Sequence, residues 1–267
     1  MIQHLIHFFT NDGLRLPGLL YEPSTKTRKA AIYLHGNGTS SVFYNPGMNL
    51  LGKKLTDNGI AFFPFNNRGA NLIKSLKKET KDGEERVMYG TAYELIGECL
   101  YDIEAALSFL YQKGYREFYL IGESTGANKI VLYSYAAQEK NIAKYVLLSG
   151  GDDTGLYYDE LGKEKFMEIL KISKEKIDQG NGAELIDRNL YSVMPMSYQS
   201  LYDTLSPDGE YNIFPFNEIM NNLQLSSKKL FREFKSIDKP TLVVYGSEDE
   251  FCYGKVPECV EILKKNT

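Results

Sequence analysis

The sequence has no tryptophan, three cysteines and three histidines in 267 residues. Cys99, Cys252 and Cys259 are an odd and sparse set, which argues against a disulfide-stapled scaffold and for reduced thiols in a cytoplasmic protein. No stretch approaches the ~18 apolar residues of a membrane span. The segment from Met1 to Phe9 has no basic region followed by a long apolar core, so we expect no signal peptide and no membrane partner.

An excess of positive charge is also lacking. The net charge is −4, which gives no reason to expect a nucleic-acid partner. The lysines of residues 74–81 are interspersed with acidic residues up to position 85, and we interpret them as a solvated loop. The content of 43% hydrophobic and 25% charged residues is ordinary for a globular protein, and the length fits one large domain, or one domain with a cap.

Apolar runs alternate with helix-like segments along most of the chain. The runs at 2–9 and 14–21 flank Asn11-Asp12-Gly13 and predict an antiparallel hairpin. Pro64 predicts a bulge or an early end of its strand, and the polar residues 66–90 predict a loop. Further strands of a buried type are expected at 30–34, 60–65, 118–121, 145–148 and 241–245, and helices at 47–57, 92–111, 125–137 and near 256–263.

This alternation predicts an α/β fold whose mainly parallel, doubly wound sheet is covered on both faces. Residues 150–235 break the rhythm, because they are polar with scattered aromatic residues and are too long for one ordinary loop. We therefore expect a core formed by residues 1–149 and 236–267, with 150–235 inserted as a largely helical cap over the carboxyl edge of the sheet.

The segment Gly122-x-Ser124-x-Gly126 lies between a predicted strand and a predicted helix. A sharp turn in this context lifts a serine side chain out of the sheet, and the glycines allow the close backbone approach that the turn needs. The helix dipole also favours negative charge beside the serine. The pattern predicts that Ser124 is a nucleophile, which needs a base to remove its proton.

The segment His35-Gly36-Asn37-Gly38 follows the first buried strand. A loop in this place supplies one backbone N–H group to the oxyanion of an acyl-transfer reaction, and the residue after the nucleophile supplies a second. We assign these two donors to Asn37 and Thr125. The side chain of His35 is expected to orient the loop rather than act as the base, and Asn66-Asn67-Arg68-Gly69 is expected to be loop architecture.

An acidic residue that orients an imidazole is expected after a late strand. Asp249 lies three residues past Gly246 and is preferred over its acidic neighbours Glu248 and Glu250. The alternative is one strand earlier, where Asp152 and Asp153 follow two glycines.

These features, in this order, resemble the α/β-hydrolase superfamily, and the resemblance covers nearly the whole chain. The matching parts are the hairpin, the His-Gly loop, the Asn-Arg-Gly loop, the Gly-x-Ser-x-Gly turn, the cap insertion and Lys-Pro-Thr-Leu-Val-Val-Tyr-Gly-x-x-Asp, which ends at Asp249. The chain is most similar to esterase-like members with a cap between the sixth and seventh strands, including dienelactone-hydrolase-like, feruloyl-esterase-like and siderophore-esterase-like groups. The resemblance implies the order nucleophile, acid, histidine.

The histidine of that order is missing, because all three histidines (His4, His7 and His35) precede Ser124. In the superfamily it follows one more strand after the acid, whereas only 18 residues follow Asp249. We hypothesise that the chain is truncated relative to its family. An exposed sheet edge and near inactivity of residues 1–267 would follow.

The sequence thus predicts a serine hydrolase that cleaves a small carboxylic ester through an acyl-enzyme and needs no metal or organic cofactor. A non-catalytic binding module on the same fold is one alternative, and a peptidase or thioesterase is another. The pattern predicts neither the acyl and alcohol groups nor the oligomeric state.

Overall fold

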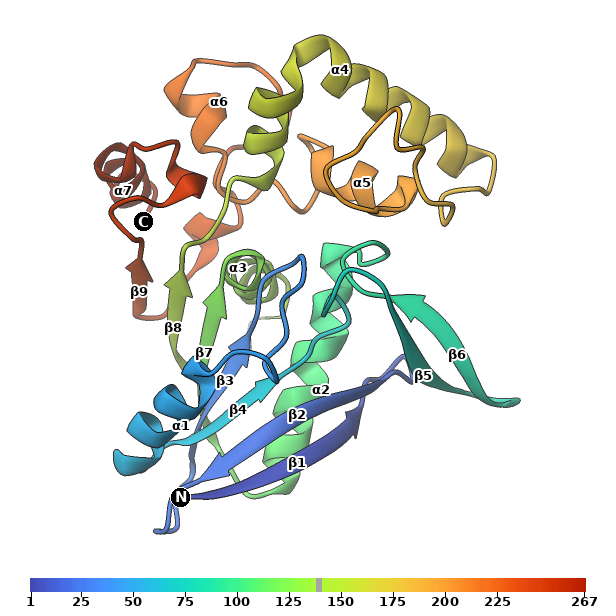
Figure 1. Ribbon diagram of the computed structural model, residues 1–267. Coiled ribbons are helices and arrows are strands. Elements are labelled where there is room, and N and C mark those ends of the chain that lie inside the picture. Colours follow the sequence, from blue (N-terminus) through green and yellow to red (C-terminus); the bar gives the residue numbers. More distant parts are fainter. Residues whose placement is uncertain (138–140) are drawn as a thin grey trace.

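The computed structural model describes residues 1–137 and 141–267, and a seven-stranded sheet runs through this part of the chain in the order β1-β2-β4-β3-β7-β8-β9 (Figure 1). The first three strands in this order pair antiparallel, and β4, β3, β7, β8 and β9 are parallel. The strands are β1 (Ile2–Phe9), β2 (Arg15–Glu22), β3 (Lys29–Leu34), β4 (Ala61–Phe65), β7 (Glu117–Glu123), β8 (Ile142–Leu148) and β9 (Thr241–Val244).

Helices cover both faces of the sheet, as the continuous apolar strands predict. α1 (Gly47–Asp57) packs against β2 and β4 on one face. α2 (Cys99–Gln112) and α3 (Thr125–Ala137) pack on the other, where α3 contacts β3, β7 and β8. Side chains of β3 alternate between the two cores, because Ala31 and Tyr33 face the α1 side while Ile32 and Leu34 face the α2 side. The predicted fold class and N-terminal hairpin are therefore confirmed.

Residues 66–90 are not the loop that their polarity predicts. β5 (Lys74–Thr80) and β6 (Gly83–Tyr89) form an antiparallel hairpin outside the main sheet. Within β5 only Leu76 is buried, so the hairpin lacks the apolar face by which strands are usually recognised. Its backbone ladder, the hydrogen bond from the Glu79 N–H to the Gly13 carbonyl and the packing of Val87 and Tyr89 against the main core hold it in place. Lys77 Nζ also lies 2.6 Å from Glu84 Oε1, in an exposed cross-strand ion pair.

Two other local expectations are also corrected. β4 runs through Pro64 to Phe65 in continuous register with β3, so the proline causes neither a bulge nor an early end. The helix expected at 92–111 begins as the 3-10 turn η1 (Ile96–Glu98) and becomes α-helical only at Cys99.

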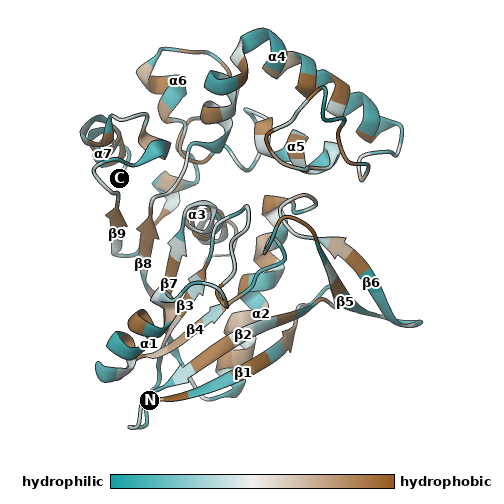
Figure 2. Cartoon of the chain, viewed as in Figure 1, coloured by the Kyte–Doolittle hydropathy of each residue, from teal (hydrophilic) through white to brown (hydrophobic). Residues whose placement is uncertain are grey.

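Above the carboxyl ends of the parallel strands lie α4 (Asp153–Asp178), α5 (Tyr198–Leu205) and α6 (Phe216–Met220), followed by the 3-10 turn η2 (Phe234–Ser236) (Figure 1). α4 and α5 share a small apolar core of their own, whereas residues from Tyr211 onward contribute to the core of the main sheet. Figure 2 shows the apolar strips of α4 and α5 between polar strips. This region lies where the cap was expected, and its last part, from Tyr211, packs into the core of the main sheet.

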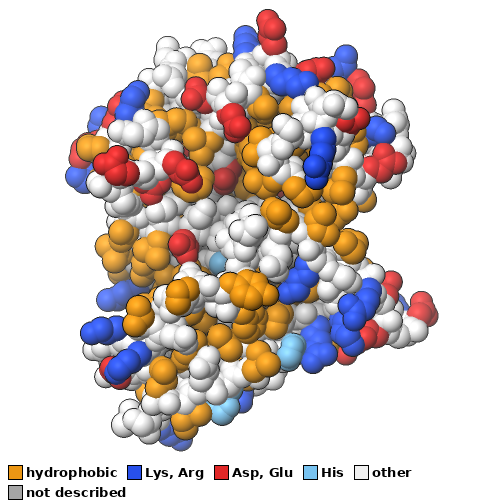
Figure 3. Space-filling model, in the orientation of Figure 1, with side chains coloured by type: hydrophobic (Ala, Val, Ile, Leu, Met, Phe, Trp, Pro, Cys, Tyr) orange, Lys and Arg blue, Asp and Glu red, His pale blue; other side chains and the backbone are white. Residues whose placement is uncertain are grey.

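β9 is an edge strand and not the buried strand that its sequence suggests. Leu242 and Val244 are 58% and 42% exposed, and Figure 3 shows apolar side chains on the surface there. The chain then passes through the 3-10 turn η3 (Glu250–Cys252) into α7 (Val256–Lys264), which buries Cys259, Ile262 and Leu263. In the described residues, no helix has the length and apolar character needed to cross a membrane.

Candidate active site

Ser124 occupies a sharp turn between β7 and α3. Its φ of 54° lies in the left-handed region that side chains rarely adopt. The turn is held by the Ser124 N–H, which donates to the Leu148 carbonyl at 2.8 Å, and by the Ala127 N–H, which donates to the Ser124 carbonyl at 2.8 Å. The geometry has the strained strand–turn–helix form expected from the sequence.

Glycines make this turn possible because neighbouring backbone lies too close for a side chain. A Cβ at Gly126 would overlap the carbonyl oxygen of Leu34, and one at Gly122 would overlap that of Gly126. The loop after β3, residues 35–38 (the Asn37 loop), also approaches the serine, since a Cβ at Gly36 would lie 2.8 Å from the Cβ of Ser124.

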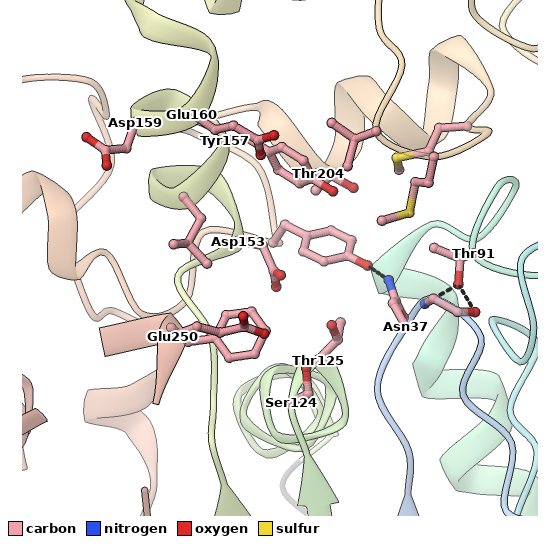
Figure 4. A pocket seen from close by; sticks show the side chains of 17 residues that line it. Asn37, Thr91, Ser124, Thr125, Asp153, Tyr157, Asp159, Glu160, Thr204 and Glu250 are labelled. Carbon is pink, nitrogen blue, oxygen red and sulfur yellow. Dashed lines mark hydrogen bonds between the residues drawn. The ribbon is translucent and has the colours of Figure 1, made fainter. Parts of the chain in front are cut away.

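A cavity of about 530 Å³ opens above Ser124. Figure 4 shows Ser124 and Thr125 at its floor, with Asn37 from the β3 loop beside them. The structure therefore brings together the expected nucleophile and the two residues expected to donate N–H groups. The other walls come from Thr91 and from the region above the sheet, and carry the apolar side chains of Leu156, Val193, Met194, Met196 and Phe251 together with Tyr157 and Tyr211.

The Asn37 loop is held from several sides. The side-chain Nδ2 of Asn37 donates to the Tyr211 hydroxyl, and Lys129 Nζ donates to its Oδ1 at 3.4 Å. The next residue, Gly38, donates its N–H to Thr91 Oγ1 at 2.8 Å, and the Thr91 hydroxyl lies 3.2 Å from the Gly38 carbonyl.

His35 is buried behind the same loop and does not face the cavity. Its Nδ1 lies 2.6 Å from the Gly36 carbonyl, and its Nε2 accepts the Asn67 N–H at 3.2 Å. These partners define a neutral tautomer with the proton on Nδ1. Burial and then the charge of Lys129 lower the pKa of His35 to about 3. His35 therefore contacts the loop and remains uncharged at neutral pH.

The acidic candidates have different surroundings. Asp153 starts α4, and Figure 4 shows its carboxylate pointing into the cavity. Burial, reinforced by the neighbouring charge of Asp152, raises the pKa of Asp153 to about 7. Asp249 is half-buried and accepts the Phe251 N–H at 3.1 Å, while its neighbours Glu250 and Phe251, but not Asp249 itself, line the cavity.

Asp152 turns away from the cavity and organises the backbone. It caps α4 by accepting the Gly155 N–H at 2.9 Å, and it also accepts the Asn217 N–H at 2.7 Å and the Tyr253 hydroxyl at 3.1 Å. Burial, which outweighs these hydrogen bonds, raises the pKa of Asp152 to about 6.

A family model with the description "Protein of unknown function (DUF1749)" matches residues 94–267, a range that contains the Ser124 turn and both acidic loops. The chain belongs to the DUF1749 family. This family has the α/β-hydrolase fold. No curated protein matches the sequence at a significant level.

Solved structures match this DUF1749 chain over almost its whole length. GrgF, an α/β hydrolase from Penicillium sp. sh18, is 14% identical with a TM-score of 0.58, over 100% of this chain and 98% of that one. Est1E from Butyrivibrio proteoclasticus with bound ferulic acid is 16% identical with a TM-score of 0.58, over 97% and 84%. An esterase from Pyrococcus furiosus is 19% identical with a TM-score of 0.54, over 99% and 79%. At these identities the likeness shows the fold.

Sequence reasoning missed the polar residues behind the site of this DUF1749 protein. Lys129 and Glu94 are buried and paired. Asn67 accepts a hydrogen bond from Lys129 and donates one to the His35 carbonyl, so it connects the pair to the Asn37 loop. One signal was available, because Lys129 is the only charged residue in the segment 125–137. A lone lysine in an otherwise uncharged helix behind a nucleophile is a candidate for a buried polar role.

Arg68 lies in the Asn-Asn-Arg-Gly loop, next to but separate from this group. Its side chain is fully buried, contacts Asp102 at 2.8 Å and Asp12 at 3.1 Å, and lies between the rings of Tyr89 and Tyr101. These contacts tie β4 to α2 and to the hairpin turn, as expected of loop architecture. Among the described residues no cluster of histidine, cysteine or acidic side chains is arranged to hold a metal ion.

Proposed function

We propose that this DUF1749 chain is a serine hydrolase that cleaves carboxylic esters through an acyl-enzyme. The observation that carries the proposal is the strained Ser124 turn at the floor of a cavity, with Asn37 and Thr125 beside it. The esterases among the structural neighbours support hydrolase chemistry on this fold, and one of them, Est1E, has ferulic acid bound.

In the proposed reaction, Ser124 Oγ forms a bond to the acyl carbon of the ester while a base removes the hydroxyl proton. The carbonyl oxygen becomes an oxyanion that the N–H groups of Asn37 and Thr125 stabilise. The carbon–oxygen bond to the alcohol then breaks, and the base returns its proton to the leaving alkoxide. Water attacks the acyl-enzyme in the same way and releases the acid and free Ser124.

The base is not supplied by an imidazole of the described residues. His35 is buried against Asn67, and His4 and His7 lie on β1, at the opposite edge of the sheet from β9. We propose that Asp249 orients the imidazole that acts on Ser124, and that Asp153 faces the substrate. Without an added base, Ser124 is then expected to be acylated slowly.

Rescue by free imidazole tests this proposal. A cavity of about 530 Å³ is large enough to admit imidazole beside a small acyl group. We expect imidazole to accelerate acylation of this chain by p-nitrophenyl acetate. Mass spectrometry should then detect an acetyl group on Ser124. The Ser124→Ala variant with the same imidazole gives the background of uncatalysed cleavage, and the entire protein-dependent increment is expected to disappear in it.

Three outcomes distinguish the alternatives. An increment that survives Ser124→Ala would overturn the role of Ser124. Fast turnover without imidazole would overturn the need for an added base. Saturable binding of the ester with no acylation at any imidazole concentration would support a non-catalytic binding module instead.

A further inference from the structure

Lys129 is a fully buried lysine that the proposed reaction does not use. It lies on α3, five residues after Ser124, and neither its side chain nor that of its partner Glu94 reaches solvent, with exposures of 0% and 1%. Burial of an ammonium group is costly unless it is paired and hydrogen-bonded. The hydrogen-bond partners of Lys129 therefore indicate its role.

Among the described residues, the Lys129 ammonium has three acceptors, and all of them lie on segments around the site. Its Nζ donates to Glu94 Oε1 at 2.5 Å, to Asn67 Oδ1 at 3.3 Å and to Asn37 Oδ1 at 3.4 Å. Asn37 follows β3, Asn67 follows β4 and Glu94 precedes η1. Lys129 thus fixes the helix behind the nucleophile to the loops that leave two neighbouring strands.

The contact with Asn37 determines how its side-chain amide is oriented. An ammonium group only donates hydrogen bonds, so the oxygen of the amide must face Lys129. The nitrogen then faces Tyr211, whose hydroxyl accepts from it. The side chain is held at both ends, and the backbone N–H of the same residue is the proposed oxyanion donor.

Asn67 extends the same network to the rest of the loop. Its Nδ2 donates to the His35 carbonyl at 3.3 Å, and its N–H donates to the His35 ring. The positive charge of Lys129 also lowers the pKa of this ring and so favours the neutral imidazole that can accept that N–H. One ammonium group therefore supports the conformation of the loop at both His35 and Asn37.

Stability alone is a poor explanation for this arrangement. Replacing a buried ion pair by apolar residues of similar size is often neutral or stabilising. The chain offers a comparison in Lys228 and Glu233, a second buried lysine–glutamate pair, 3.5 Å apart, whose residues do not line the cavity. Glu233 also accepts from the half-exposed Arg232 at 2.6 Å, and Arg232 can turn to solvent when Glu233 is removed. A structural role predicts similar behaviour of the two pairs, whereas a role in positioning predicts different behaviour.

We propose that Lys129, held by Glu94, is a positioning residue that orients the Asn37 loop so that its backbone N–H meets the oxyanion. The proposal rests on the proposed ester hydrolysis at Ser124. Lys129 itself does not line the cavity, so it acts through Asn37 and not on the substrate.

The test removes both charges at once, so that no unpaired charge stays buried. In Lys129→Met/Glu94→Leu we expect the rate constant of imidazole-assisted acylation to fall ~10- to 100-fold, because a misplaced donor loses most of its stabilisation of the oxyanion. The half-saturating ester concentration should change less than ~3-fold, since the walls of the cavity remain. The matched control, Lys228→Met/Glu233→Leu, should keep the wild-type rate constant.

A second readout does not depend on activity. The side-chain amide signals of Asn37 in a ¹⁵N NMR spectrum, assigned by their loss in Asn37→Asp, should shift in Lys129→Met/Glu94→Leu and stay in place in the control. An unchanged rate constant together with unchanged Asn37 signals would overturn the proposal. If wild-type protein shows no acylation that depends on Ser124, the proposed function fails and the NMR comparison alone decides the role of Lys129.

A milder variant covers the case in which the apolar pair does not fold. Lys129→Gln/Glu94→Gln is uncharged but keeps a donor next to Asn37, and we expect it to retain an intermediate rate constant and a smaller shift of the Asn37 signals. A wild-type rate constant and spectrum in this variant would overturn the need for the ammonium charge.

Discussion

The loops after β8 and β9 begin alike and end in different environments. Each follows an apolar strand, passes a glycine and reaches acidic residues at the same edge of the sheet. A side chain at Gly150 would contact Phe214, whereas a side chain at Gly246 would meet no atom within 4 Å. The first loop is packed under the region above the sheet and the second is open. Acidic residues in similar sequence patterns therefore differ in burial, and so in pKa, according to the segments that pack on them.

The largest expected effect concerns Asp153, the carboxyl of the first loop that faces the cavity. Burial raises the pKa of Asp153 from 3.8 to about 7. Between these values the folded protein holds a proton that the unfolded chain has lost, so folding is stabilised below pH ~4 and this stabilisation is lost as the pH rises to ~7.

Relative to Asp153→Asn, the wild-type free energy of unfolding should therefore fall by up to about 4 kcal/mol across this range and then level off. Urea unfolding of both proteins at a series of pH values measures the difference. A difference that does not vary with pH would show that folding does not raise the pKa of Asp153.

The second largest effect concerns Asp152, the neighbour of Asp153 that turns away from the cavity. Asp152→Ala leaves the donors of Gly155, Asn217 and Tyr253 without their acceptor. Loss of a helix cap and of buried hydrogen bonds should lower the free energy of unfolding by about 3 kcal/mol. Thermal unfolding measures it, and Asp152→Asn, which keeps an acceptor, is the control expected to lose less.

The smallest effect concerns the open loop and is kinetic. If Asp249 orients the imidazole, Asp249→Asn should lower imidazole-assisted acylation ~30-fold, equivalent to about 2 kcal/mol. Its effect on stability should be small, because Asn can still accept the Phe251 N–H. A larger loss of rate in Asp153→Asn than in Asp249→Asn would reverse the roles given to the two loops.

The parts of the fold that follow from sequence are those with a strong local signal. The bounds of α1 and α3 agree with the expected ranges 47–57 and 125–137, because apolar periodicity and Asn58-Gly59 mark them. The parallel sheet follows from its continuous apolar runs. Ser124, Asn37 and Thr125 could be placed beside one another because carboxyl ends of parallel strands share one edge.

What the sequence does not reveal depends on contacts between distant segments. The β5–β6 hairpin is held by backbone pairing between two mostly polar strands, and one polar strand read alone looks the same as a solvated loop. The exposure of Leu242 depends on how far the helices extend over the face of the sheet, and α1 covers β2 and β4 but not β9. The partnership of Lys129 with Glu94 and Asn37 joins residues that lie 35 and 92 positions away.

The exposed face of β9 has a practical consequence for handling the protein. β9 is the last strand of the sheet, so its free backbone edge, next to the exposed side chains of Leu242 and Val244, can pair with the same edge of another molecule. At the high protein concentrations that NMR spectroscopy needs, the protein would then aggregate or precipitate with time. Leu242→Lys places a charge in the middle of the strand. If this single change keeps the protein in solution for longer, β9 is the surface through which it associates.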